Sequence, residues 1–175
     1  MADPASDSER LRKNRTTGLA VAAAVFLFDQ AMKWVVTYPL QLPHRATIDV
    51  VPFFTLRWLK NTGVSMSLLN AESEMGRWLL VALTGAIAAF VAFWMWREKR
   101  RDDSVALALV LGGALGNILD RVRLGYVVDY ADLHFGDVHP FLVFNVGDAA
   151  ITIGVLLLLV RALLTRERKS PKEDK

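Results

Sequence analysis

The apolar residues of this chain form four long runs rather than the one-sided stripes typical of soluble helices. The runs lie at about residues 18–38, 78–96, 104–121 and 146–164. A helix needs roughly 20 predominantly apolar residues to cross the hydrocarbon core of a bilayer. Each run is long enough, or nearly so. The pattern therefore predicts an all-α integral membrane protein with four transmembrane helices.

Two loops, one between the first and second runs and one between the third and fourth, predict smaller elements. Both lie on the side called outer below. In the longer loop, about residues 39–77, "PFFTLRWLKNTG" places Phe54, Leu56 and Trp58 at alternate positions, a period of two that is typical of a half-buried strand. The letters "NTG" predict a turn after this strand. The segment "ESEMGR" predicts a short interfacial helix before the second run. The second outer loop, about residues 122–145, is rich in Asp and contains short extended pieces.

The basic residues indicate how the chain is oriented. They gather before the first run, between the second and third runs, and after the fourth. In a four-span arrangement all three groups lie on one side, which the positive-inside rule places in the cytoplasm together with both termini. The polar tails, residues 1–17 and 165–175, then flank a membrane domain at residues 18–164.

Charge and composition narrow the partners further. The net charge of +3 is explained by topology and by contacts with anionic membrane lipids, so nucleic acid is not an expected partner. The chain has no cysteine, which excludes a disulfide framework, a thiol nucleophile and a cysteine metal site.

Several polar residues occupy positions where they are costly. Asp, Lys or Arg at the centre of a membrane helix costs about 2.5–3.5 kcal/mol, and such residues usually face a protein interior and serve a function. Spacings of three or four place residues on one helix face, and the topology brings these groups to one depth near the outer leaflet. They are Asp29 with Lys33, Asn117 with Asp120 and Arg121, Asn145 with Asp148, and Asp129 in the outer loop.

Two carboxylates at one level suggest a specific chemistry. Like charges a few ångströms apart cannot both ionise easily, so Asp129 and Asp148 would share one proton. The ionised carboxylate can take a proton from water while the protonated one hydrogen-bonds a scissile carbonyl. This is the chemistry of aspartic proteases, and it needs neither a cofactor nor a metal.

A purely structural role for these polar residues stays open at this point. Asp29 with Lys33 and Asp120 with Arg121 fit structural ion pairs, and Asp148 fits a helix cap. The chain would then be a non-catalytic membrane protein, such as a small transporter or assembly factor.

Two further catalytic alternatives involve different residues. His134 and His139 have side chains that suit a metal, although their spacing matches no standard zinc motif. Ser65 or Ser67 activated by Lys33 would give a serine–lysine enzyme.

The ordered segments "DQAMK", "VPFFTLRWLKNTGVSMSLL", "GGALGNILDRVRLGYVVDY" and "FNVGDAAI" resemble the lipoprotein signal peptidases (signal peptidase II), which are bacterial membrane aspartic proteases. The resemblance covers nearly the whole chain from Asp29 to the end of the fourth run. The chain departs from the common family pattern at Gly147, where Ala is usual, and at Ser65-Met66-Ser67, where Ala-Phe-Ser is usual.

The resemblance implies the fold, the activity and the roles of the residues. It implies a four-helix membrane bundle with a small external β-element, in the inner membrane with the site towards the periplasm. The substrates would be diacylglyceryl-modified prolipoproteins, cleaved just before the lipidated cysteine, and one chain would act as a monomer. Asp129 and Asp148 would be catalytic. Residues implied to bind substrate or support the site are Asp29, Lys33, Asn61, Gly63, Asn117, Asp120, Arg121 and Asn145.

Overall fold

The computed structural model of the chain describes residues 4–63 and 74–167. Within them lie four long helices: α1 (Pro4–Thr37), α3 (Glu74–Arg97), α4 (Arg101–Leu124) and α5 (Val146–Glu167). Each contains a window long and apolar enough to cross a membrane. The prediction of four transmembrane helices is confirmed.

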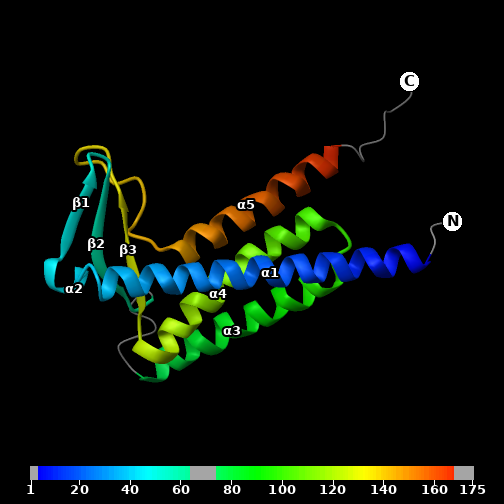
Figure 1. Cartoon of the computed structure of the whole chain (residues 1–175), viewed down its shortest axis with the longest axis horizontal. Coiled ribbons are helices and arrows are strands. Elements are labelled where there is room, and N and C mark those ends of the chain that lie inside the picture. The colour runs from blue at the N-terminus through cyan, green and yellow to red at the C-terminus, as the bar shows by residue number, and fades with distance from the viewer. Residues whose placement is uncertain (1–3, 64–73, 168–175) are drawn as a thin grey trace.

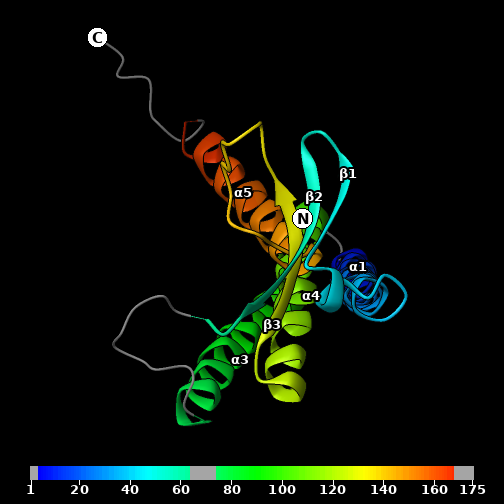
Figure 2. The ribbon, with the colours of Figure 1, turned by 90° about the vertical axis from the view of Figure 1, so that its left-hand side faces the viewer.

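A three-stranded antiparallel sheet lies across one end of the helix bundle, and α1 begins and α5 ends at the opposite end (Figure 1). Its strands β1 (Thr47–Val51), β2 (Phe54–Asn61) and β3 (Val127–Leu133) are hydrogen-bonded in that order, and a one-turn helix, α2 (Leu42–Arg45), precedes β1. The second view shows the sheet passing over the ends of the helices (Figure 2). The predicted strand is β2.

The apolar face of β2 holds the sheet on the bundle. Its alternating side chains pack on a buried cluster formed by α1, α2 and β3. The residues of β2 in this contact are Phe54, Leu56 and Trp58, and the buried cluster comprises Val36, Leu42, Val128, Tyr130 and Ala131. Strand β2 is paired with β3, and Asn61 lies opposite Val127. The packing of β2 therefore also fixes β3, the strand that carries Asp129.

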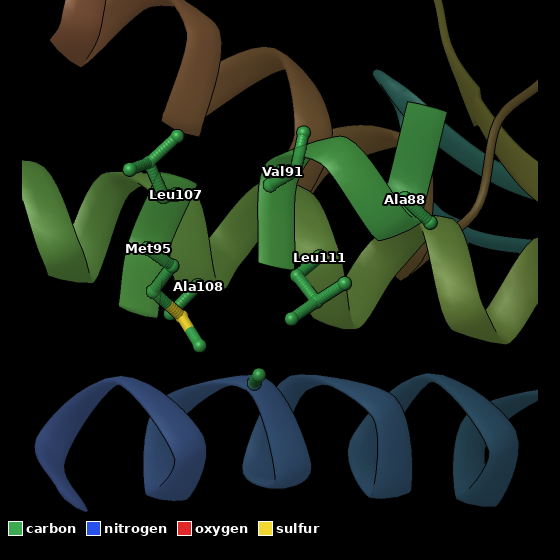
Figure 3. Close-up of a cluster of buried hydrophobic side chains, with 7 residues drawn as sticks. Ala88, Val91, Met95, Leu107, Ala108 and Leu111 are labelled. Carbon is green, nitrogen blue, oxygen red and sulfur yellow. The ribbon is translucent and has the colours of Figure 1, made fainter. Parts of the chain in front are cut away.

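Helix α4 is the centre of the bundle, because it packs against each of the three remaining long helices. Half of its most apolar window is buried inside the protein, against 17–22% for those three, whose remaining apolar surface is left for lipid. Figure 3 shows one part of this core, where Met95 of α3 and Leu111 of α4 point towards α1 and Leu107 of α4 points to the opposite side.

Glycines of α4 allow the close approach of its neighbours. A Cβ on Gly113 would overlap the backbone carbonyl of Gly147 at the start of α5, whereas a Cβ on Gly85 of α3 meets no atom within 4 Å. Small residues at such contacts let membrane helices pack backbone to backbone.

Gly113→Ala is therefore expected to destabilise the protein by about 1–3 kcal/mol, the usual cost of overpacking. Gly85→Ala, which makes the same change in an open place, is expected to leave stability unchanged or slightly raised. Thermal unfolding of the two variants in detergent checks this. Equal melting temperatures would show that the α4–α5 contact is not tight.

The structure differs from the sequence predictions at two places. Helix α1 begins at Pro4, so helix continues through most of the segment expected to be a polar tail. This part of α1 is tied to the α3–α4 link, where Asn14 Nδ2 donates to the Lys99 carbonyl (2.7 Å). In the predicted interfacial helix "ESEMGR", Glu74 to Arg77 instead form the first turn of α3, and the two residues before them lie outside the described residues. The short helix in this outer loop is α2.

Candidate active site

Asp148 lies in the first turn of α5 and caps that helix together with Asn145. The Asn145 side-chain oxygen accepts the Asp148 backbone N–H (2.9 Å), and Asp148 Oδ2 accepts the Asn145 backbone N–H (3.2 Å). This reciprocal arrangement is a capping box, and it satisfies two N–H groups at the helix start. The cap leaves Asp148 Oδ1 to accept the side-chain N–H of Asn117 (2.8 Å).

Asp129 meets the same group of side chains from the sheet. Its Oδ1 accepts the Asn145 Nδ2 hydrogen bond (2.6 Å), and its Oδ2 accepts that of Asn61 Nδ2 (2.8 Å). The side chain is almost fully buried, at 1% exposure. Asn145 is thus hydrogen-bonded to both carboxylates, so the two acidic groups belong to one site.

Lys33 is a buried cation next to the site that holds Asp129 and Asp148. Its ammonium lies 2.8 Å from Asp29 Oδ2, 2.8 Å from Asp120 Oδ2 and 2.9 Å from the side-chain oxygen of Asn117. The predicted pair of Asp29 with Lys33 is present. Asp120, expected to pair with Arg121, pairs with Lys33 instead, since Lys33 and Asp120 meet across the α1–α4 contact.

The two partners of Lys33 each hold the backbone next to one of the acidic residues of the site. Asp29 Oδ1 accepts the N–H of Gly147 (2.8 Å), and Asp120 Oδ2 accepts the N–H of Val128 (3.2 Å). Gly147 directly precedes Asp148, and Val128 directly precedes Asp129. Lys33, Asp29 and Asp120 therefore position both carboxylates without touching either.

The amide groups around the site have their orientations set by donors on their far sides. The Asn117 oxygen accepts from Lys33, so its NH₂ faces Asp148, and the Asn145 oxygen accepts from the Asp148 backbone, so its NH₂ faces Asp129. An amide presents one acceptor and one donor end. Each carboxylate consequently receives N–H donors, which stabilise its ionised form.

Burial raises the pKa of Asp129 to about 6, and the nearby charge of Asp148 acts in the same direction, against the hydrogen bonds from Asn61 and Asn145 and the charge of Lys33, which lower it. The folded protein thus favours a protonated Asp129 more than the unfolded chain does. This contribution to stability is full below the ordinary carboxyl pKa of 3.8 and is lost as pH rises through about 6.

Asp129→Asn removes that pH dependence. We expect the melting temperature of the variant, relative to wild type, to increase as pH rises from about 4 to about 8, since the wild type must ionise a buried carboxyl over this range. Thermal unfolding in detergent at several pH values checks the sign. A difference between the two proteins that does not change with pH would contradict the raised pKa.

Arg121 and Gly63 complete the site on the side of α3. Gly63 has a φ of +74°, its N–H donates to the Asn61 side-chain oxygen (2.9 Å), and a Cβ on it would lie 3.3 Å from Arg121 Nη2. This is the predicted "NTG" turn. Glycine there permits the turn and leaves room for the guanidinium of Arg121.

Comparisons with known proteins agree with this geometry. The family model described as Signal peptidase (SPase) II matches residues 21–164. The chain is 59% identical over 161 residues to the "Lipoprotein signal peptidase" of Rhizorhabdus wittichii, with 92% of this chain and 94% of the relative covered. The chain belongs to the signal peptidase II family.

A second relative and a solved structure extend the likeness. The "Lipoprotein signal peptidase" of Sphingopyxis alaskensis is 56% identical over 158 residues, which cover 90% of this chain and 91% of that one. The fold resembles a solved bacterial membrane enzyme with a TM-score of 0.76 and 28% identity, covering 91% of this chain and 95% of that structure. A family of aspartic-type proteases fits a site built around two carboxylates.

The departure from the common family pattern at Gly147 lies inside the site. A Cβ there would lie 3.0 Å from the Asn145 side-chain oxygen and 3.3 Å from that of Asn117. The alanine usual in this family would touch both amides that bond to the acidic residues. Glycine relieves that contact in this chain and keeps the Gly147 N–H on Asp29.

Every residue implied by the resemblance to the signal peptidase II family lies in or beside the site, and the structure adds one more. Gln30 donates from its side chain to Asp120 Oδ1 (3.1 Å), to Asp29 Oδ2 (3.2 Å) and to the Gly116 carbonyl (3.3 Å). The signal in the sequence that could have identified Gln30 is its polar side chain directly after Asp29 in an apolar run. Sequence reasoning missed it because an uncharged amide is less costly in a membrane helix than a charge, and so it stands out less.

The two histidines of the alternative metal chemistry lie elsewhere on the sheet. His134 Nε2 lies 3.0 Å from the Thr55 hydroxyl, and His139 Nδ1 lies 2.9 Å from Asp132 Oδ1. Thr55 is near the start of β2, whereas Asn61, which contacts Asp129, is its last residue. Among the described residues, no group of three or more His, Asp or Glu side chains could hold a metal ion. Ser65 and Ser67 lie outside the described residues.

Proposed function

We propose that Asp129 and Asp148 form the catalytic dyad with which this lipoprotein signal peptidase hydrolyses its substrates. The observation that carries the proposal is that Asn145 hydrogen-bonds to both carboxylates. The two carboxyls are held by one residue, Asp129 is buried, and the charge of Asp148 raises the pKa of Asp129, which together favour a single shared proton.

The reaction follows from that shared proton. The ionised carboxylate takes a proton from a water molecule, whose oxygen attacks the scissile carbonyl carbon. The protonated carboxyl donates its proton to the carbonyl oxygen, giving a tetrahedral diol. When the C–N bond breaks, the proton first taken from water passes to the leaving nitrogen, and one diol hydroxyl returns its proton to the carboxylate that had donated. The products are a signal-peptide carboxylate and a free amino group, and the dyad regains one proton.

Arg121 supports the proposal as a group that binds the substrate backbone. Its Nε is buried and has no acceptor among the residues that the structure describes, and the guanidinium lies beside Gly63. A buried donor without a partner is costly, so a substrate carbonyl there would gain both a hydrogen bond and a position. Lys33, Asp29, Asp120 and Asn117 are positioning residues.

The depth of the site fits a lipid-modified substrate. The site lies where the sheet meets the ends of the helices, and the spans expose many large apolar side chains to lipid. The ribbon shows the sheet at this end of the bundle (Figures 1 and 2). We propose that diacylglyceryl-modified prolipoproteins bind with their acyl chains in the bilayer, and that cleavage occurs just before the lipidated cysteine. The site then faces the periplasm from the inner membrane, with both tails in the cytoplasm.

One described chain supplies both acidic residues and all the groups that hold them, which supports a monomer as the active form. The alternative of a non-catalytic transporter or assembly factor is not favoured, because the chain belongs to a protease family.

The proposed function is tested by identifying the product of cleavage. Purified protein and a synthetic prolipoprotein with a diacylglyceryl cysteine are expected to give a product that begins with that cysteine, identified by mass spectrometry. The matched peptide without the lipid is expected to react far more slowly, and a chelator to have no effect, since water is activated by carboxylates. Equal cleavage of both peptides, or inhibition by the chelator, would contradict the proposal.

A further inference from the structure

A second site lies at the end of the bundle remote from the acidic residues. There the first turns of α1 and the beginning of α4 border an open surface cavity of about 620 Å³. It is lined by Arg10, Arg12, Lys13, Asn14, Thr16, Thr17 and Arg101. Cavities that hold small ligands are of this size. Its lining contains four cationic side chains and no carboxylate.

Most of the cationic side chains that line the cavity form no ion pair with a residue that the structure describes. Of the four cations, only Lys13 has an ion pair among the described residues, with Glu9 at 2.8 Å, and both of those side chains are more than half exposed. Exposed pairs of this kind are weak. Arg10, Arg12 and Arg101 therefore keep their donors for another partner.

The nearest acidic residues of α4 are engaged on another side. Arg161 of α5 lies 2.8 Å from Asp103 Oδ1 and 3.3 Å from Asp102 Oδ2. Although both carboxylates follow Arg101 directly, neither lines the cavity. The charge of the cavity is consequently not cancelled by its own helix.

The wall of the cavity is held in place without a ligand. Asn14, 7% exposed, donates to the Lys99 carbonyl (2.7 Å), and its own carbonyl accepts from Ser104 Oγ (3.3 Å). Next to it, Arg15 donates to the Trp96 carbonyl (2.9 Å) and lies over the Trp96 ring. The charged side chains thus project from a fixed backbone, which reduces the ordering cost of binding.

The surroundings favour an amphiphile over a soluble anion. Leu19 of α1, 49% exposed, and Trp96 of α3, 47% exposed, follow the cavity towards the apolar part of the bundle. Trp side chains concentrate where lipid headgroups meet acyl chains, and basic pockets between membrane helices on the cytoplasmic side bind phosphate-bearing headgroups. A lipid could place its phosphate in the cavity and its chains against the adjoining apolar faces.

We propose that this cavity binds the headgroup of an anionic glycerophospholipid, with its phosphate among Arg10, Arg12 and Arg101. The lipid belongs to the leaflet opposite the peptidase site, the cytoplasmic one in the proposed orientation. Bound there, it ties the beginning of α1 to the α3–α4 link. The site is separate from the cleavage reaction.

Native mass spectrometry of the full chain in neutral detergent tests the proposal, with phosphatidylglycerol, phosphatidylcholine and inorganic phosphate as probes. The wild type is expected to retain phosphatidylglycerol in preference to phosphatidylcholine. Arg12→Gln/Arg101→Gln is expected to lose about tenfold or more in affinity for phosphatidylglycerol, since each basic side chain near an anionic headgroup contributes on the order of 1 kcal/mol.

The matched control is Arg97→Gln/Lys99→Gln, which removes two exposed positive charges at the same end of the bundle but outside the cavity lining. It is expected to bind phosphatidylglycerol like the wild type. Equal binding by the two double variants would overturn the proposal. Displacement of the lipid by millimolar inorganic phosphate would overturn the lipid assignment and leave a simple anion site.

Signal-peptide cleavage by both double variants separates this proposal from the proposed peptidase function. Both are expected to cleave at the wild-type rate, which also shows that they are folded. If Arg12→Gln/Arg101→Gln does not fold, Arg12→Lys/Arg101→Lys keeps the charge and is expected to retain phosphatidylglycerol. Loss of binding in that variant would count against a charge-based headgroup site.

Discussion

Asp129→Asn and Asp148→Asn are each expected to lower the rate of prolipoprotein cleavage by about 10³-fold or more. Each change removes a group that must exchange a proton with water, the carbonyl oxygen or the leaving amine. Asn is nearly the same size as Asp, so the helix and strand that carry these residues remain in place. The measurement is the initial rate of cleavage of a lipid-modified prolipoprotein in detergent.

Asp137→Asn is the matched control, because Asp137 is an exposed carboxylate in the loop between β3 and α5. It removes the same charge from the same outer region and is expected to leave the rate unchanged. Wild-type rates for either Asp129→Asn or Asp148→Asn, in protein that unfolds at a normal temperature, would remove that residue from the mechanism.

Lys33→Met is expected to have the largest effect on stability. It leaves the carboxylates of Asp29 and Asp120 buried without a counter-charge, and removing one partner of a buried ion pair costs about 3–5 kcal/mol. The released carboxylates would also loosen their hold on the backbone before Asp129 and Asp148. The melting temperature in detergent and the cleavage rate are both expected to fall.

Lys60→Met provides the control for Lys33→Met. Lys60 lies on the exposed side of β2 over the ring of Tyr126, and it forms no ion pair with a described residue. Its replacement is expected to change the melting temperature little. If Lys33→Met and Lys60→Met had equal melting temperatures, the ion pairs of Lys33 with Asp29 and Asp120 would not be needed for stability.

The span count and the depth of the polar residues could be predicted because both follow from hydropathy and helix spacing. Runs of apolar residues fix which segments cross the bilayer, and intervals of three or four residues fix which side chains share a face. These two rules place Lys33 beside Asp29 and bring Asn145 and Asp148 to the same end of the bundle, at the start of α5. The alternation in β2 is equally local, and it predicts the strand.

The contacts that hold the site could not be predicted, because they join elements far apart in the chain. Nothing local shows that Asp29 accepts the N–H of Gly147, or that Asp120 turns from its neighbour Arg121 to Lys33. Asp148 both caps α5 and belongs to the acidic site. One carboxylate oxygen caps α5 through Asn145, and the second is held by Asn117.

The most direct test of the dyad is the double variant Asp129→Asn/Asp148→Asn, compared with the two single variants in the same cleavage assay. Groups that act as one unit show effects that do not add. Because the shared proton requires both carboxyls, we expect the double variant to be no slower than the slower single variant. A double variant whose loss equals the product of the two single losses would show that Asp129 and Asp148 act independently, and would contradict the account.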